Sequence, residues 1–507
     1  MPAVGQYLRV ARTYDPAACS RILTIAAALR RLAPDGVREI CAAPGSVYVE
    51  WDDERLPSAS AARWIDAAIE EPGADDEPAR TVEVPVRYGG PDTEEAASML
   101  GLDARELASI HAGGEYRVFS TATAGQPIMG GADARLELPR RPVPRASVPE
   151  RAVGIQGRFS TVYAAGPGGW NLIGTALVNV FDPHRDDPFT FHHGDVVRFH
   201  ASDAPDPPAP ARRELLPREP ARPALRVEAA GALDLVLDAG RLNQAHHGLA
   251  QTGPLDPPAA RLANALCGNA PGTPCIESTL TGPTLVALRD LVVGAAGRGL
   301  ALEVDGERVA CESIFVTSGA TLRLRPTGEG VRGYLAIAGG IEAEPFLGSV
   351  SVDRYGLIGR PLEPGDILGV AVGEPREVRL RATIDGAQPP HVIRVRRGPQ
   401  WSREAEAALA HAAFTVTTGD RMGLRLAGPP VPGGELLSES PPPGAVQVPP
   451  SGDPIILLAD RMRSAGYDKP AVVHPDDLPA IAQLRAGDRI GFAFVGDHPV
   501  PWERDLT

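Results

Sequence analysis

The sequence predicts a mainly β fold with a small α/β domain at the N-terminus, one barrel-like unit in the first half and two in the second. Apolar and polar residues alternate in short runs over much of the chain, a period of two that is typical of strands with one buried face. Glycine and proline are dense between these runs, as in β-barrels and sandwiches. A Gly-Asp pair also recurs before apolar strands, which indicates repeated units.

Residues 1–80 are predicted to form the α/β domain. Asp15-Pro16 supplies an N-cap and a proline at the first helical position, and the apolar pattern after it continues to about Leu32. A second helix is expected after Ser60, and the run 46–51 between the two helices is typical of a strand.

Residues 81–202 are predicted to form the first barrel. From Thr81 the apolar residues follow a strand period of two, at Val82, Val84, Val86 and Tyr88. Two short helices follow, the second with a capping box from Asp103 to Glu106 and a glycine stop at 113–114. Short alternating runs then continue to Phe199.

A proline-rich segment separates the two halves. Residues 203–224 contain seven prolines and no apolar periodicity, so we expect an extended, solvated linker. Beyond it we predict a barrel over 225–375, with one helix from Asp256-Pro257 to Cys267, and another barrel over 376–507.

The repeated dipeptide supports this count of units. Each occurrence is interpreted as the turn into the last strand of a unit, which places the units near 82–200, 225–371 and 378–495. The three pairs are Gly194-Asp195, Gly365-Asp366 and Gly487-Asp488.

Composition limits the function classes. The 507 residues carry a net charge of -14, which argues against nucleic acid and anionic membranes as partners and favours a small polar ligand. Lys469 is the only lysine, and it lies in neither a P-loop nor a biotin-acceptor motif. The chain therefore has no biotin attachment site of its own, and its cofactors are otherwise open.

The five cysteines are odd in number and form no CxxC pair, which favours buried thiols over disulfides or a zinc site. The apolar run 22–29 is too short for a membrane span and lies too far from the N-terminus for a signal peptide. We expect a cytoplasmic, bacterial protein that binds no metal.

Several motifs of the first half occur in one order and spacing: Pro85–Gly90, Glu115–Val118, Val153–Gly157, Pro167–Gly174 and Phe181–Pro183. This set resembles the first subunit of the allophanate hydrolase/5-oxoprolinase family. The second half resembles the other subunit over nearly its whole length. Its motifs include Gly240-Arg241, His246, Asp256-Pro257, Arg261–Asn264, Tyr334–Gly340, Asp420–Gly423, Ser438-Glu439, Gln447–Pro449 and Pro454–Arg461.

The resemblance implies a single-chain fusion of two subunits, similar to the carboxyltransferase part of urea amidolyase. It implies cyclophilin-like barrels that pair around a shared active site. Implied activities are ATP-dependent opening of a cyclic amide and biotin-dependent carboxyl transfer to urea, and some relatives inhibit a sensor kinase. ATP, a separate partner subunit and a homo-oligomer are all compatible with it.

The chain departs from the family pattern in segments that resemble a ligand pocket. The strand 121–129 lacks two aromatic rings, and 159–164 and 462–468 are also altered. At Val350 the family has an arginine that is suited to binding a carboxylate or phosphate. Because scaffold glycines persist, either the substrate differs or catalysis has been replaced by partner binding.

Candidate catalytic residues come from the second half. Asp460 and Tyr467 would act as base and hydrogen-bond donor, or the aspartate only caps a turn. Glu439 and Gln447 flank a triple-proline loop and would polarise an amide, unless the loop is simply solvated. His246 is a candidate acid, base or ligand contact, or packs under a glycine-rich loop.

Candidate substrate-binding residues are implied mainly by the resemblance. Asp420 and Arg421 are also interpreted as a structural ion pair that holds their loop, and Gly168 and Gly169 permit a close backbone approach. The full set is Tyr116, Gly125, Phe159, Ser160, Gly168, Gly169, Trp170, Arg241, Asp420 and Arg421.

Three hypotheses follow. The first is an enzyme acting on a small amide, lactam or urea-like substrate at the interface of the two halves. The second is a repurposed biosynthetic enzyme that handles another metabolite without ATP or biotin. The third is a non-catalytic regulatory protein.

Overall fold

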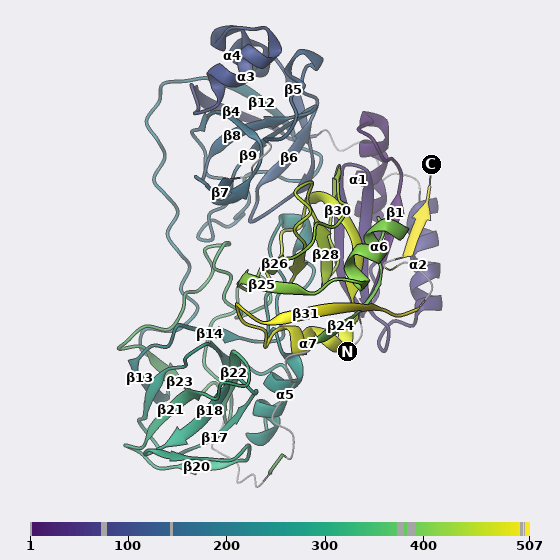
Figure 1. The fold of residues 1–507 in the computed structure, drawn as a ribbon. Coiled ribbons are helices and arrows are strands. Elements are labelled where there is room, and N and C mark those ends of the chain that lie inside the picture. The colour runs from purple at the N-terminus through teal and green to yellow at the C-terminus, as the bar shows by residue number, and fades with distance from the viewer. Residues whose placement is uncertain are drawn as a thin grey trace.

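The computed structural model describes residues 3–71, 79–141, 145–372, 380–382, 391–496, 500 and 502–506. It confirms a mainly β fold with barrel units. Figure 1 shows the first barrel at one end, the middle unit at the other, and the C-terminal barrel beside the N-terminal domain. The expected boundary at 375/376 lies outside the described residues. No helix in the described part of the chain is long and apolar enough to cross a membrane.

The N-terminal domain is a four-stranded sheet with two helices packed on it. The last strand of the chain, β32, pairs in parallel with β1, so the C-terminus belongs to this sheet and not to the last barrel as expected. Both predicted helices form, and Asp15 caps the first by accepting a hydrogen bond from the backbone of Ala17. The elements are β1 (Ala3–Arg9), α1 (Pro16–Arg31), β2 (Val37–Ala43), β3 (Ser46–Asp52), α2 (Ser58–Glu70) and β32 (Trp502–Asp505).

The first barrel is closed, with strand order β11-β4-β12-β5-β6-β9-β8. The predicted capping box between Asp103 and Glu106 starts its second helix. Its elements are β4 (Thr81–Tyr88), α3 (Thr93–Leu100), α4 (Ala104–Ala112), β5 (Glu115–Thr121), β6 (Pro127–Gly130), η1 (Ala134–Leu136), β7 (Arg145–Val148), β8 (Ala152–Gln156), β9 (Phe159–Val162), β10 (Gly166–Gly168), β11 (Asn171–Ala176) and β12 (Val196–Ala201).

The middle unit consists of a six-stranded and a five-stranded sheet that share one apolar core. The predicted helix α5 packs on β17 and β22 of the smaller sheet. Its elements are β13 (Pro223–Ala229), β14 (Leu233–Leu237), η2 (Ala245–His247), α5 (Pro257–Leu266), β15 (Cys275–Thr279), β16 (Thr284–Ala287), β17 (Leu291–Ala296), β18 (Leu300–Val304), β19 (Glu307–Arg308), β20 (Ile314–Val316), β21 (Thr321–Pro326), β22 (Arg332–Ile337) and β23 (Ile367–Gly369).

The C-terminal barrel is an eight-stranded sheet that closes because β24 also pairs with β30. Its elements are β24 (Val392–Arg397), α6 (Arg403–Ala410), β25 (Phe414–Gly419), β26 (Gly423–Ala427), β27 (Glu435–Glu439), β28 (Ala445–Val448), β29 (Ile455–Leu457), β30 (Ala465–Val473), η3 (Pro475–Asp477), α7 (Leu478–Ile481) and β31 (Arg489–Phe494).

The Gly-Asp repeat is confirmed as one turn used three times. Gly194, Gly365 and Gly487 have φ of 91°, 96° and 95°, a left-handed backbone that favours glycine, and they precede β12, β23 and β31. Each turn exchanges two backbone hydrogen bonds with a valine of a neighbouring strand, namely Val118, Val227 and Val416. The turn therefore starts the last strand of each unit.

The linker is extended as predicted and is visible as a long trace between the first barrel and the middle unit (Figure 1). It is not solvated throughout, however. Leu215 is buried in the core of the first barrel, and Arg213 forms a β-bridge with Ile358 of the middle unit. The segment therefore holds these two units together through packing as well as through the chain.

Candidate functional site

The N-terminal sheet is buried on both faces. On β3, Val47, Val49 and Trp51 pack in the core beneath the helices, while Tyr48 and Glu50 alternate with them and point to the opposite face. The same alternation puts Tyr7, Arg9, Glu39 and Cys41 on that second face. The second half of the chain covers this polar face, which is why every residue of β3 is buried.

A cavity of about 860 Å³ lies where this face meets the second half. We call it the interface cavity. Its wall includes residues of the N-terminal domain, the middle unit and the C-terminal barrel, among them Arg38, Tyr48, Glu50, Gln251, Thr252, Gly253, Leu255, Arg261, Asn264, Pro442, Pro443, Gly444, Leu457, Ala459 and Arg461. Two parts of the chain far apart in sequence thus enclose one space.

Opposite charges meet on one wall of the interface cavity. Glu50 accepts hydrogen bonds from the hydroxyl of Tyr48 at 3.1 Å and from the Gln251 amide at 3.4 Å. The Arg461 guanidinium lies nearby, with Nη2 3.9 Å from a Glu50 oxygen, and Nε donates to the Pro441 carbonyl at 2.9 Å. Burial and the Glu50 charge raise the pKa of Tyr48, so its phenol stays protonated as a donor.

A second group of buried charges joins the N-terminal sheet to the C-terminal barrel. Glu439 pairs with Arg9 at 2.7 Å and with Lys469 at 2.9 Å. Glu39 lies 3.6 Å from Arg463. Burial raises the pKa of Glu39 to about 7, although Arg463 opposes the shift. These contacts fix the sheet against the barrel.

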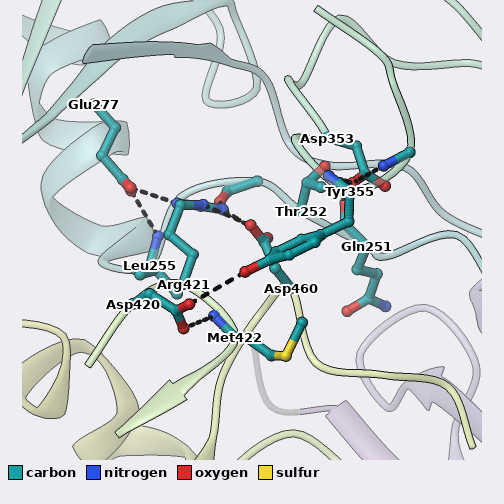
Figure 2. Close-up of polar contacts among 12 residues, drawn as sticks. Gln251, Thr252, Leu255, Glu277, Asp353, Tyr355, Asp420, Arg421, Met422 and Asp460 are labelled. Atoms are coloured by element: carbon teal, nitrogen blue, oxygen red, sulfur yellow. Dashed lines mark hydrogen bonds and ion pairs between the residues drawn. The ribbon is translucent and has the colours of Figure 1, made fainter. Parts of the chain in front are cut away.

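Arg421 and its two carboxylate partners form a buried cluster beside the cavity (Figure 2), which we call the Arg421 cluster. Arg421 binds Asp460 through two hydrogen bonds of 3.0 Å each and also donates to Glu277. Its Nη2 donates to the Gly253 carbonyl at 2.6 Å, while Glu277 accepts from the Leu255 backbone at 2.9 Å. Because Gly253 and Leu255 line the cavity, the cluster positions that part of its wall.

The cluster also shifts the ionisation of its members. Burial raises the pKa of Asp460 to about 6 despite the opposing charge of Arg421. Burial alone would raise the pKa of Glu277, but Arg421 and Arg332 lower it overall. Arg421 itself stays charged because its two carboxylates outweigh the effect of burial on its pKa.

The structure corrects the expected ion pair between Asp420 and Arg421. Asp420 instead accepts hydrogen bonds from the backbone of Met422 at 2.8 Å and of Gly423 at 3.1 Å, and from the Tyr355 hydroxyl at 3.2 Å (Figure 2). Adjacent residues point to opposite sides of the chain here, so only Arg421 reaches the buried carboxylates.

The predicted catalytic residues do not meet at one point. Asp460 holds Arg421, and Glu439 is buried in an ion-pair network and not in a solvated loop. The Tyr467 ring stacks on Arg140 at 5.4 Å, and the Tyr467 carbonyl accepts from Lys469 at 3.0 Å, near Glu439. Gln447 lies buried in β28.

His246 belongs to a separate group of histidines at the junction of the first barrel and the middle unit. Its ring lies 3.9 Å from that of His247, which stacks on Phe189 at 4.0 Å. The Thr121 hydroxyl donates to the His246 carbonyl at 2.8 Å. Burial lowers the pKa of His246 to about 2 and of His247 to about 4, so both rings are neutral at neutral pH. This group is part of the packing at the junction.

Most predicted substrate-binding residues lie in the first barrel. Tyr116 packs on His111 in its core, and Ser160 lies 2.9 Å from the same imidazole. Phe159 contacts Tyr14 edge-on at 4.8 Å. His111, in the last turn of α4, is itself fully buried, so its contacts belong to the packing of the barrel, while the Phe159–Tyr14 contact joins the barrel to the N-terminal domain.

The glycines and the remaining candidates also have structural contacts. The Gly125 N–H donates to the His247 carbonyl at 2.8 Å, and a side chain on Gly168 would collide with Tyr163. The Gly169 carbonyl accepts from the backbone of Arg141, and Trp170 is buried near Phe159. Arg241 donates to the carbonyls of Phe346 and Ser351.

None of the fifteen predicted site residues lines the interface cavity. Sequence reasoning missed Tyr48, Glu50, Gln251 and Arg461. Two sequence signals could have pointed to these residues. The charged Glu50 lies inside the apolar strand 46–51, and Arg461 is the last residue of the motif from Pro454 that resembles the family. The described residues contain no group of three or more histidine, cysteine or acidic side chains that could hold a metal.

Two family models match the two halves. The model "Carboxyltransferase domain, subdomain C and D" matches residues 4–191, and "Carboxyltransferase domain, subdomain A and B" matches residues 247–494. These ranges include both sides of the interface cavity.

Curated relatives and solved structures agree with these matches. The chain is 33% identical over 281 residues to a 5-oxoprolinase subunit of Escherichia coli, covering 53% of this chain and 90% of that protein. It is 42% identical over 125 residues to a different 5-oxoprolinase subunit, from Bacillus subtilis, covering 24% of this chain and 52% of the relative. The crystal structure of TTHA0988 superposes with a TM-score of 0.92 at 45% identity, covering 97% of this chain and 100% of the other.

Proposed function

Since the chain belongs to the family of 5-oxoprolinase subunits and carboxyltransferase domains, we propose that it is an enzyme acting on a small amide, lactam or urea-like substrate in the interface cavity. The observation that carries this proposal is the cavity itself, whose walls come from both halves. A volume of about 860 Å³ is in the usual range for a small-molecule site.

The wall chemistry supports carbonyl activation. Arg461 is a buried guanidinium in the cavity wall and is the candidate group to stabilise an oxygen that gains negative charge. Glu50 is a carboxylate beside it, held by Tyr48 and Gln251, and is the candidate base. The Arg421 cluster holds the wall segment of Gly253 and Leu255, which follows Gln251, and so helps to keep the base in place.

The test is turnover by the full chain. We would incubate it with 5-oxoproline and ATP, and separately with urea and ATP, each with and without a separately expressed partner subunit, and measure phosphate release and product. Glu50→Gln and Arg461→Gln should each reduce the rate at least roughly a hundredfold, since each removes a group placed at the reacting carbonyl. Arg425→Gln, at an exposed position of β26, is the matched control. Absence of release with both substrates would contradict the family chemistry.

A repurposed enzyme of the same fold is the second candidate, favoured by the altered segment 121–129. This segment is not the single strand that the sequence predicts but the end of β5, a turn and the start of β6. Its side chains bond to one another: Thr123 donates to Gln126 at 3.0 Å, and Gln126 donates to Thr161 at 3.3 Å. Ile128 and Met129 are buried in apolar clusters. A substrate other than 5-oxoproline, handled without ATP or biotin, fits these changes. Mass spectrometry of small molecules that co-purify with the chain would identify it, and recovery of a protein partner without any small molecule would favour a regulatory role instead.

A further inference from the structure

The loop at residues 251–253 contributes backbone donors without acceptors to the wall of the interface cavity. The backbone N–H groups of Gln251, Thr252 and Gly253 donate to no acceptor among the described residues, although Thr252 is only 5% exposed and Gly253 is buried. Such buried N–H groups are rare in folded proteins, because each one costs about the free energy of a lost hydrogen bond. All three residues line the cavity. A ligand oxygen in the cavity would accept from them.

The backbone of this loop is held in a conformation that few side chains adopt. Thr252 has a φ of 54° and Gly253 a φ of 77°, both in the left-handed region. That region is an outlier for a β-branched residue such as threonine, and strain of this kind clusters at ligand sites. The Thr252 hydroxyl donates to the Gln251 carbonyl at 2.7 Å, and Arg421 donates to the Gly253 carbonyl at 2.6 Å. Contacts on both sides of Thr252 therefore maintain the strained backbone.

This conformation determines where the donors point. Successive N–H groups of a helical backbone lie on the same side, as they do in the first turn of a helix, so those of Thr252 and Gly253 lie side by side. Gly253 has no side chain, so its backbone is what lines the cavity, and its carbonyl is already bound by Arg421. A Cβ at this position would lie 3.1 Å from the Ala239 carbonyl oxygen, so that side of the Cα is packed against the chain. The two N–H groups are thus the donors that this part of the wall offers.

We infer that the backbone N–H groups of Thr252 and Gly253 form an oxyanion hole, which holds the carbonyl oxygen of the substrate in the interface cavity. The inference rests on the proposed function and deepens it, because it names the hydrogen-bond donors. Two fixed backbone donors bind an oxygen more strongly as it gains negative charge. The preceding residue, Gln251, donates to Glu50 at 3.4 Å, so the candidate base lies beside the same loop. The Nη atoms of Arg461 are buried, so this guanidinium adds its charge while the hydrogen bonds come from the loop.

Crystals of the full chain soaked in acetamide test the inference without turnover, and acetamidinium is the matched control probe. The two molecules have the same shape, but acetamide has an oxygen acceptor where acetamidinium has a second N–H donor group. We expect the acetamide oxygen within hydrogen-bond distance of the Thr252 and Gly253 nitrogens, and no acetamidinium at that place. Acetamide missing from these nitrogens, a protein oxygen bound to them, or equal occupancy by both probes would overturn the inference.

Replacing one backbone N–H with an ester oxygen gives a second measurement. Gly253→glycolic acid removes only this donor. Gly348→glycolic acid is the matched control, because Gly348 is exposed, does not line the cavity, has a left-handed φ of 82° and has an N–H without an acceptor among the described residues. We expect the Gly253 ester to have the melting temperature of wild type and a kcat lower by about a hundredfold or more, with KM little changed. The control should match wild type in all three quantities.

The outcomes separate this inference from the proposed function. An unchanged kcat in the Gly253 ester, or a melting temperature that falls together with kcat, would refute the oxyanion hole. If this ester turns over normally while Glu50→Gln does not, the proposed function stands and the inference fails. If the full chain converts neither 5-oxoproline nor urea, the proposed function fails, and the acetamide crystals alone decide whether the loop binds a carbonyl oxygen.

Discussion

Replacing Arg421 with methionine should destabilise the contact between the middle unit and the C-terminal barrel. Arg421 neutralises Glu277 and Asp460, which are both buried, and donates to the Gly253 carbonyl. Arg421→Met keeps most of the apolar volume but removes the cation that both buried carboxylates share, so that only Arg332 still acts on Glu277. Removing one partner of a buried ion pair costs about 3–5 kcal/mol, which corresponds to a fall of more than about 10 °C in the melting temperature of a domain of about 100 residues, such as the C-terminal barrel.

Calorimetry and limited proteolysis would measure the effect. We expect the transition of the C-terminal barrel to shift to lower temperature and the Gly253–Leu255 segment to become sensitive to protease. The combined change Arg421→Met, Glu277→Gln and Asp460→Asn should recover part of the loss, because neither carboxylate then remains buried without Arg421. A loss below about 1 kcal/mol in the single variant, similar to that of Arg425→Gln, would refute the account of the cluster.

Three further predictions concern buried ionisable groups. The pKa of Glu39 is raised from 4.5 to about 7, so its contribution to stability falls as pH rises from 4.5 to 7. Glu39→Gln should remove a pH dependence of roughly 3 kcal/mol from the free energy of unfolding. A difference in melting temperature between variant and wild type that stays constant from about pH 5 to 7.5 would contradict this. His247 has its pKa lowered from 6.5 to about 4, so stability is lost as pH falls below 6.5. His247→Phe, which keeps the stacking, should be more stable than wild type at about pH 5 by about 2 kcal/mol. If the difference in free energy of unfolding between variant and wild type were the same at acid and at neutral pH, the prediction would be wrong. Lys469→Met should cost about 3 kcal/mol by removing a partner of Glu439, and a melting temperature equal to wild type would exclude this role for the only lysine.

Local signals predicted much of the fold. Three kinds of signal set helix starts and turns through contacts between residues close in sequence, so the structures they form can be predicted from the sequence alone. These are Asp15-Pro16, the Asp103 capping box and the Gly-Asp turns. The pairing of β32 with β1 could not be predicted in this way, because it joins the two ends of the chain and no periodic pattern records which strands meet.

The candidate site was harder to predict from the sequence, because it too depends on which distant segments meet. Glu50 and Arg461 meet only because the N-terminal sheet packs on the C-terminal barrel. Single-strand patterns show that Glu50 alternates with apolar neighbours, which is typical of a solvent-facing side chain. The sheet is covered on both sides, however, so this residue is buried. Asp460 was predicted to be a base or to cap a turn, and its two hydrogen bonds from Arg421 make it part of a support and not of the cavity wall.

The most direct test of the central claim is the turnover of 5-oxoproline by the full chain when one wall residue from each half is changed. We predict that wild type converts 5-oxoproline, and that Glu50→Gln in the N-terminal domain and Arg461→Gln in the C-terminal barrel each abolish conversion while Arg425→Gln does not. Conversion that survives both changes would place the chemistry outside the interface cavity and contradict the account.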